Sequence, residues 1–264
     1  MRDRVVLVTG GAGNLGRCFV AALLERGARV AVFDALEERQ ARERLDGLGS
    51  NSSLRFEKVD VTDGASLGAA LARVRTDWGV PHGLINAAAI DAPPGAPPEE
   101  NGPFETYPAE SFDRIMAVNV KGVMLSCQVI GAAMAEAGRG AIVNIGSTYG
   151  LVSPDQSLYD YRRERGETFY KPVAYSASKS ALYNLTRYLA TYWARKGVRV
   201  NTLTPGGVFA GQDEDFLEGY ARRVPMGRMA RENELDGAVV FLLSEASSYM
   251  TGANLVVDGG WTAW

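Results

Sequence analysis

The chain has 264 residues, 46% of them hydrophobic, and a formal net charge of −3. A chain of this size can bury the core of one α/β domain, and we expect a single domain over 1–264. The weak negative charge provides no basic surface for nucleic acid or for a membrane. Strand character begins by Arg4, so we expect no secretory signal, and we expect no apolar stretch long enough to span a bilayer. Two cysteines are too few for a disulfide framework, which fits the reducing cytoplasm.

The first predicted elements are a strand over 4–9, a glycine-rich turn and a helix. The turn reads Gly10-Gly-Ala-Gly-Asn-Leu-Gly16. Glycines there let backbone N–H groups approach a pyrophosphate, which the positive end of the helix favours. The next predicted strand, 29–33, leads into Asp34, eighteen residues after Gly16. A carboxylate at that position would meet the adenosine ribose hydroxyls of a dinucleotide.

Further strand-like runs alternate with helical patterns along the chain. They lie at 54–59, 83–86, 140–146, 198–203 and 254–257. This alternation predicts an α/β fold, a doubly wound parallel sheet of the Rossmann type with helices on both faces. Three connections are long. The proline-rich 91–98 predicts a loop, 153–171 is an insertion, and 206–220 is the third.

Three polar residues indicate acid–base chemistry. Tyr175 and Lys179 are four residues apart, which places the phenol and the ammonium on one helical face. An unperturbed tyrosine ionises near pH ~10, so a nearby cation must lower its pKa before it can act as a base at neutrality. Lys179 is the candidate for that cation. Ser147 directly follows the predicted strand 140–146 and can hydrogen-bond a substrate oxygen.

With these motifs in order, the chain resembles the short-chain dehydrogenase/reductase family in its classical branch, over essentially its whole length. The resemblance implies a catalytic set of Asn119, Ser147, Tyr175 and Lys179. It implies cofactor contacts from Gly10, Gly13, Asn14, Leu15, Gly16, Asp34, Asp60, Val61, Asn86, Ala87, Tyr175, Lys179, Pro205, Gly206 and Val208. It also implies that 206–220 acts as a substrate lid, and it requires no metal.

Some positions depart from the family's pattern. Asn14 replaces the middle glycine of the turn, while Ala87 and Ala89 replace an Asn and a Gly after the fourth strand. Ala210 stands where the family has a threonine four residues after Pro-Gly. Binding of the nicotinamide carboxamide is therefore expected from backbone groups near Val208.

The resemblance implies an oxidoreductase that interconverts a secondary alcohol and a ketone of a small molecule, and a polyol, sugar or sugar derivative is our preferred substrate class. Asp34 would repel a 2′-phosphate, so NAD is expected rather than NADP. The nearby bases that could accept the phosphate are Arg17, Arg39 and Arg42. Two alternatives stay open. One is a 3-oxoacyl-thioester (acyl carrier protein) reductase, and the other is a redox sensor that binds NAD without turnover.

The insertion is the most individual segment. It makes the spacing from Ser147 to Tyr175 twenty-eight residues, about twice what the resemblance implies. It carries Arg162, Arg163, Arg165 and Lys171, which could bind an anion, but also Asp155, Asp160, Glu164 and Glu167. Balanced charge of this kind is typical of a self-paired, solvated surface, and the sequence leaves both interpretations open.

We expect a homotetramer or homodimer. The resemblance implies packing of the helices that carry Asn119 and Tyr175 against their copies in a second subunit. Apolar positions suited to that contact are Ala181, Leu182, Leu185, Leu189 and Trp193. Trp261 and Trp264 near the C-terminus are further residues that a monomer would cover poorly.

Overall fold

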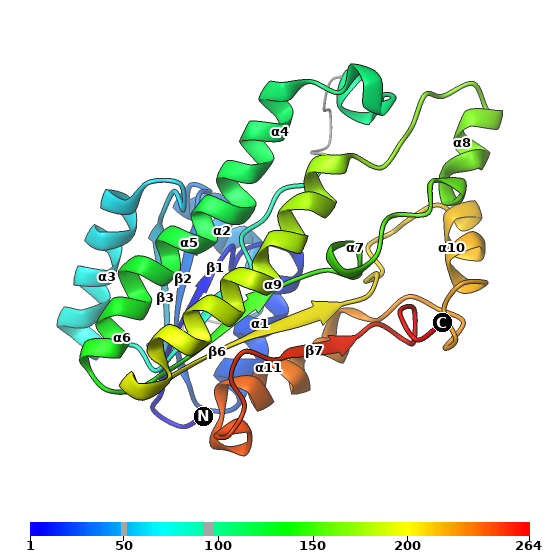
Figure 1. The fold of residues 1–264 in the computed structure, drawn as a ribbon. Helices are drawn as coiled ribbons and strands as arrows, with labels where there is room; N and C mark the ends of the chain where they lie inside the picture. Colours follow the sequence, from blue (N-terminus) through cyan, green and yellow to red (C-terminus); the bar gives the residue numbers. More distant parts are fainter. Residues whose placement is uncertain (49–51, 92–97) are drawn as a thin grey trace.

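The computed structural model describes residues 1–48, 52–91 and 98–264, and these form a sheet with helices on both faces (Figure 1). The seven strands are all parallel, in the order β3-β2-β1-β4-β5-β6-β7. They are β1 (Val5–Thr9), β2 (Arg29–Asp34), β3 (Leu54–Lys58), β4 (Gly83–Asn86), β5 (Gly140–Ile145), β6 (Val198–Pro205) and β7 (Asn254–Val257). The predicted fold class and strand positions are confirmed.

The helices fill the connections between the strands. They are α1 (Asn14–Glu25), α2 (Glu38–Arg44), α3 (Gly64–Trp78), α4 (Ala109–Met116), α5 (Val123–Ser126), α6 (Ala132–Glu136), α7 (Thr148–Leu151), α8 (Asp160–Glu164), α9 (Val173–Trp193), α10 (Glu214–Ala221) and α11 (Asp236–Leu243). Two π-helical segments, Ala117–Gly122 and Cys127–Gly131, join α4, α5 and α6 into one long rod.

Short 3-10 segments complete the helical content of the described residues. They are Pro98–Asn101, Phe104–Thr106, Gln156–Tyr159, Ala194–Lys196, Glu232–Leu235 and Glu245–Ser247. The last residue of the predicted loop 91–98, Pro98, begins a 3-10 segment. Residues 92–97 lie outside the described residues. The insertion 153–171 contains a 3-10 turn and α8, and 206–220 contains most of α10, so neither segment is structureless.

Two apolar layers cover the sheet. On one face, α3, the 109–136 rod and α9 contribute buried side chains such as Leu67, Ile130 and Leu182. On the other, α1 and α11 contribute Phe19 and Val239. Every residue of β1 is buried, as expected of a central strand that is covered on both faces. Burial on both sides explains why a central strand such as β1 is a continuous apolar run, whereas the edge strand β3 mixes apolar and charged residues.

The rod 109–136 corrects one expectation. Its 28 residues are long and apolar enough to cross a membrane, with a mean hydropathy of 1.5 over the most apolar window. Length and composition alone do not distinguish such a span from a core helix. Val123, Cys127 and Met134 pack against the sheet, so this side of the rod owes its apolar character to the core.

The remaining candidate residues have structural contacts. His82 precedes β4, and its Nδ1 accepts a hydrogen bond from the Val5 N–H at 3.2 Å. Burial, with Arg139 and Arg4 nearby, lowers the pKa of His82. Both cysteines are free thiols, as expected, but only Cys127 is fully buried, because Cys18 on α1 keeps part of its surface exposed.

Candidate active site

The turn after β1 has room for backbone only. Gly10 has a φ of +63°, and a Cβ there would lie 2.6 Å from Ala88 Cα. A Cβ on Gly16 would lie 2.1 Å from the Gly10 carbonyl oxygen. Gly13 caps α1 in an extended conformation, and its N–H donates to Gly10 O at 3.0 Å. This bare turn before a helix N-terminus fits the pyrophosphate of a dinucleotide.

Asp34 ends β2 beside this turn. Its carboxylate accepts hydrogen bonds from Ala12 N–H at 3.0 Å and from Leu36 N–H at 3.2 Å. Both bonds fix the carboxylate at the carboxyl end of the strand, where the resemblance expects a ribose. The bases of this region are already paired with carboxylates: Arg17 with Glu232 at 2.8 Å, Arg42 with Glu38 at 2.5 Å and Arg39 with Glu43 at 3.7 Å.

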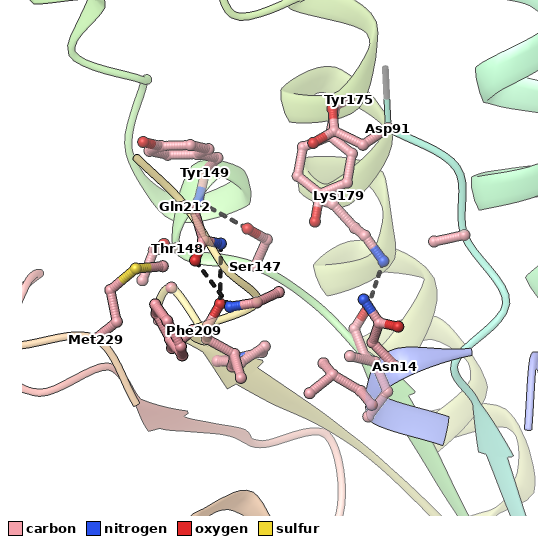
Figure 2. A pocket seen from close by; sticks show the side chains of 18 of the residues that line it. Asn14, Asp91, Ser147, Thr148, Tyr149, Tyr175, Lys179, Phe209, Gln212 and Met229 are labelled. Atoms are coloured by element: carbon pink, nitrogen blue, oxygen red, sulfur yellow. Dashed lines mark hydrogen bonds between the residues drawn. The ribbon is translucent and has the colours of Figure 1, made fainter. Parts of the chain in front are cut away.

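A pocket of about 410 Å³ opens next to the turn, at the carboxyl ends of the strands (Figure 2). The strand order reverses between β1 and β4, and ligands of doubly wound sheets bind at such switch points. Of the predicted residues, the pocket is lined by Asn14, Leu15, Ala87, Ser147, Tyr175, Lys179, Pro205, Gly206 and Val208. Gly10, Gly13, Gly16, Asp34, Asp60, Val61, Asn86 and Asn119 lie outside this lining.

Tyr175 is on the first turn of α9, and its side chain faces the pocket. Burial, followed by the Asp91 carboxylate, raises the pKa of Tyr175, while a hydrogen bond with Ser147 lowers it. The net direction is upward, opposite to the expectation that Lys179 would depress it. Removal of the phenol from water outweighs the other influences.

Lys179 lies one turn further along α9. Only 3% of the residue is exposed, and its Nζ donates to the Ile145 carbonyl at 2.8 Å. Burial lowers the pKa of Lys179 to about 8, and Asp91 opposes that change. Its Nζ lies 5.8 Å from the centroid of the Tyr175 ring. The two side chains therefore share one helical face, as their spacing predicts.

Ser147 follows β5 and caps α7. Its Oγ accepts a hydrogen bond from the Tyr149 N–H at 3.2 Å. The Tyr183 hydroxyl donates to the Ser147 carbonyl at 2.8 Å and lies 2.9 Å from Thr204 Oγ1. Both ends of the serine are thus held by α7 and α9, which fixes its hydroxyl at the mouth of the pocket.

Asn119 is fully buried in the π-helical segment between α4 and α5. Its Oδ1 accepts from Ile90 N–H and its Nδ2 donates to Ile90 O, both at 2.8 Å. Nδ2 also lies 3.0 Å from Ser178 Oγ on α9. Asn119 therefore ties the strand exit after β4 to α9 without lining the pocket.

Asn86 also faces away from the pocket. Its Nδ2 donates to Asn144 Oδ1 at 2.8 Å, and Asn144 donates to Thr186 at the same distance. Thr202 Oγ1 completes the chain at 2.8 Å from Thr186. These buried polar side chains connect β4, β5, β6 and α9, so Asn86 contributes to the sheet rather than to the pocket wall.

Two other predicted cofactor residues, Asp60 and Val61, have local contacts, whereas the backbone near Val208 forms part of the pocket wall. Asp60 uses its carboxylate locally, accepting from Thr62 N–H at 2.8 Å, and Val61 is buried near Gly122 of the rod. At Ala210, where the family has a threonine, the N–H donates to Gln212 Oε1 at 2.8 Å. Gln212 Nε2 then donates to the Val208 carbonyl at 3.2 Å and closes a small loop on the pocket wall.

The insertion is attached to the segment 206–220. Tyr159 packs its ring 4.8 Å from Phe169 within the insertion and 5.6 Å from Phe216 of α10, centroid to centroid. The Tyr161 hydroxyl donates to Asp213 at 2.9 Å, and Arg165 forms an ion pair with Asp215. These contacts join 153–171 and 206–220 into one wall of the pocket.

The three arginines of the insertion have partners. Arg162 pairs with Glu167 at 2.6 Å, Arg163 with Asp160, and Arg165 with Asp215. None of the three lines the pocket. The three arginines therefore belong to a self-paired surface, as one of the two interpretations of the insertion expects. Lys171 is the basic residue of the insertion that lines the pocket.

Several pocket residues were missed by the sequence argument. They are Asp91, Thr148, Phe209, Gln212, Phe216, Tyr220, Met229 and Glu232. Figure 2 shows Asp91, Tyr175 and Lys179 on one side of the pocket, with Ser147, Tyr149 and Gln212 on the other. The sequence did carry one signal for these residues, which is their place in or beside the long connections. Both 91–98 and 153–171 begin or end near predicted site residues. In the described part of the chain, no three His, Cys, Asp or Glu side chains are grouped as a metal site needs.

A bare glycine turn and a pocket with a Ser, Tyr and Lys at the switch point define a Rossmann-type, nicotinamide-dependent oxidoreductase. Residues 10–262 match a family model described as enoyl-(acyl carrier protein) reductase. The chain belongs to the short-chain dehydrogenase/reductase family, in its classical branch, and is an enzyme that interconverts a secondary alcohol and a ketone.

Three curated relatives illustrate the range of the family near this chain. D-threitol dehydrogenase of Mycolicibacterium smegmatis is 33% identical over 98% of this chain and 93% of its own length. 2-(S)-hydroxypropyl-CoM dehydrogenase 3 of Xanthobacter autotrophicus is 35% identical over 100% and 98%. Galactitol 2-dehydrogenase (L-tagatose-forming) of Cereibacter sphaeroides is 35% identical over 97% and 94%.

A similar solved structure is a short-chain dehydrogenase from Leptospira borgpetersenii serovar Hardjo-bovis with bound NAD+. It is 32% identical, covers 99% of this chain and 94% of its own, and has a TM-score of 0.86.

Proposed function

We propose that this enzyme is an NAD-dependent dehydrogenase that acts on a polyol, a sugar or a sugar derivative. The observation that carries the proposal is the polarity of the pocket wall beyond the acid–base set: Asp91, Lys171 and Gln212 lie across from or beside Tyr175. A simple alcohol would leave the buried Asp91 Oδ1 without a hydrogen-bond partner, which costs binding energy. The names of the threitol and galactitol relatives support the same substrate class.

The proposed roles follow from the contacts described above. When bound, the oxidised nicotinamide supplies the hydride acceptor. Ser147 hydrogen-bonds the substrate oxygen, and Tyr175 takes the hydroxyl proton as the carbonyl forms. Lys179, when protonated, favours the phenolate and holds the nicotinamide ribose. Asn119 keeps the Ile90 strand exit in place and would position a water that passes the proton to solvent. In reduction Tyr175 returns the proton.

NAD rather than NADP is part of the proposal. The Asp34 carboxylate would accept hydrogen bonds from ribose hydroxyls and repel a 2′-phosphate. The pairing of Arg17, Arg39 and Arg42 with carboxylates supports this preference, because each guanidinium already has an acidic partner. The NAD+ in the Leptospira relative is consistent with it.

The two alternatives are less well supported. An acyl-carrier-protein reductase needs a basic surface for an acidic carrier, whereas the lid beside the pocket carries Asp213, Glu214, Asp215 and Glu218. A non-catalytic sensor has no need for an acid–base set. The test is a spectrophotometric screen of polyols, aldonates, sugar phosphates and oxoacyl thioesters with NAD and NADP. Polyol turnover with NAD is expected, and exclusive turnover of thioesters with NADPH would refute the proposal.

We further infer a single catalytic domain with the insertion as a pocket wall, and a homotetramer or homodimer in a reducing compartment such as the cytoplasm. Leu182 is fully buried in the chain's own core, and Leu189 and Trp193 are largely buried there, so they add little to the surface expected of them. The support comes instead from their neighbours on α9, Tyr188 and Tyr192, which are 62% and 59% exposed. The free thiols of both cysteines support the reducing compartment.

A further inference from the structure

An ion pair crosses the pocket entrance between two segments far apart in the chain. Asp91 lies just beyond β4, and Lys171 is the last residue of the insertion, eighty positions later. The Lys171 ammonium donates to Asp91 Oδ2. The Lys171 side chain is only 14% exposed, and the Asp91 side chain is 39% exposed. Both residues line the same pocket as Ser147 and Tyr175.

The backbone of Lys171 is fixed by a reciprocal amide contact. Its N–H donates to Gln156 Oε1 at 2.8 Å, and Gln156 Nε2 donates to the Lys171 carbonyl at 3.1 Å. Arg163 in turn donates to the Gln156 carbonyl at 2.8 Å. These bonds lock the end of the insertion, so the ammonium is held in place before any substrate arrives.

The Asp91 carboxylate has spare acceptor capacity. Lys171 occupies Oδ2, whereas Oδ1 is buried and has no hydrogen-bond partner among the described residues. A buried carboxylate oxygen without a partner costs free energy, which a ligand hydroxyl would recover. The preceding residue, Ile90, is clamped on both its N–H and its carbonyl by Asn119. Asp91 therefore presents a positioned acceptor.

The pair is close to the reacting group. Lys171 Nζ lies 5.1 Å from the centroid of the Tyr175 ring, nearer than Lys179 Nζ at 5.8 Å. A single small ligand can therefore reach the Tyr175 hydroxyl and the ion pair together. A vicinal diol offers what such a site needs: one hydroxyl to lose a proton and a second that both donates and accepts.

We propose that Asp91 and Lys171 determine substrate specificity by binding the hydroxyl next to the reacting carbinol, with Asp91 Oδ1 accepting a hydrogen bond from it and Lys171 donating one to its oxygen. This inference rests on the proposed polyol function and assigns the residues that recognise the polyol. The pair is neutral as a unit and the arginines of the insertion are paired elsewhere, so the site selects a neutral polyol over a phosphate or a carboxylate.

The test uses three four-carbon substrates, D-threitol, 2,3-butanediol and 2-butanol, of which the last lacks the neighbouring hydroxyl. We expect D91N and K171M each to lower kcat/KM for D-threitol and 2,3-butanediol, relative to kcat/KM for 2-butanol, by roughly 10 to 100-fold. The double variant should lose less than the product of the single losses, because the residues act as a pair. Inhibition constants of the same compounds provide the comparison wherever turnover is too slow.

Two controls separate the explanations. D77N removes a carboxylate from an ion pair with Arg55 outside the pocket and should leave the diol preference unchanged. NAD dissociation constants and unfolding midpoints show whether each pocket variant is still folded. Equal losses on all three substrates would overturn the specificity assignment while leaving the polyol function intact. A wild-type enzyme that turns over no polyol in the screen would instead refute the proposed function.

Discussion

The side-chain amide of Asn119 forms two hydrogen bonds with the backbone of one residue, Ile90, at 2.8 Å each. Ile90 is the residue before Asp91. A backbone N–H and carbonyl that leave a strand end need partners, and a buried amide supplies both at once. Through these two hydrogen bonds, Asn119 in the π-helical segment Ala117–Gly122 holds the residue before Asp91 at the pocket edge without lining the pocket itself.

We expect Asn119→Ala to lower the free energy of unfolding by about 1–3 kcal/mol, because both Ile90 groups lose their partners. It should also raise KM for the polyol, since Asp91 follows the released residue. Chemical denaturation and steady-state kinetics measure the two effects. Asn184→Ala, at an exposed position of α9, is the control. An unchanged unfolding midpoint would show that the two hydrogen bonds between Asn119 and Ile90 add no stability.

Tyr175→Phe removes only the ionisable oxygen. We expect kcat to fall by roughly 10²-fold or more with the NAD dissociation constant nearly unchanged, because ring packing is retained. Tyr249→Phe, where the tyrosine is fully exposed, controls for loss of a phenol elsewhere. Single-turnover kinetics follow the chemical step. Retention of most of the turnover in the Phe variant would exclude Tyr175 as the acid–base group.

The buried Lys179 predicts a pH dependence of stability. Its folded-state pKa is about 8 and its ordinary value is 10.5, so between these pH values the unfolded chain holds a proton that the folded protein lacks. Stability from this group therefore rises with pH across that window and is constant below it. The unfolding free energy of wild type minus that of Lys179→Met should increase between pH 8 and pH 10.

The measurement is denaturant unfolding of both proteins at several pH values. The difference between their unfolding free energies cancels the contributions of titratable groups that the two proteins share. Lys121→Met, at an exposed position, controls for loss of a surface charge. A difference that stays constant or falls over the window would contradict the effect of burial on Lys179.

The cofactor preference is tested at Asp34. We expect wild type to bind NADH more tightly than NADPH, and Asp34→Asn to narrow that ratio by about tenfold or more, because the amide keeps the shape and removes the repulsion of a 2′-phosphate. Fluorescence titration with both reduced cofactors gives the dissociation constants. Tighter binding of NADPH by wild type would refute the NAD assignment.

The exposed face of α9 predicts assembly. A groove between α9 and the 109–136 rod is lined by Met124, Leu185, Tyr188, Tyr192 and Trp193, among others. Apolar grooves of this kind are typical of subunit contacts. Light scattering at micromolar concentration should give a dimeric or tetrameric mass, and a Tyr188→Glu, Tyr192→Glu double variant should dissociate.

Phe104→Glu offers the matched control for the assembly test, because this phenylalanine is 74% exposed but lies outside the groove. A monomeric wild-type mass would contradict the assembly.

The sequence by itself determined the features that depend on nearby residues. Short β-branched apolar runs that alternate with helical patterns favour strands covered on both faces, so strand positions and the parallel sheet were predictable. The helical repeat places Tyr175 and Lys179 on one face at a spacing of four. Gly10 and Gly16 in the turn stand where a Cβ has no room, and the glycine-rich composition already indicates such a close approach of the backbone. These are local consequences of backbone geometry.

Only the tertiary structure decided the features that depend on closing long connections. Asp91 and Lys171 meet across eighty positions because the insertion folds back onto the pocket. Burial, which sequence spacing does not encode, raises the pKa of Tyr175 where the Lys179 cation alone would lower it. Packing likewise sends Trp193 into the core and leaves Tyr192 exposed. Desolvation and long-range contact depend on which surfaces meet, and that is fixed only when the whole chain is folded.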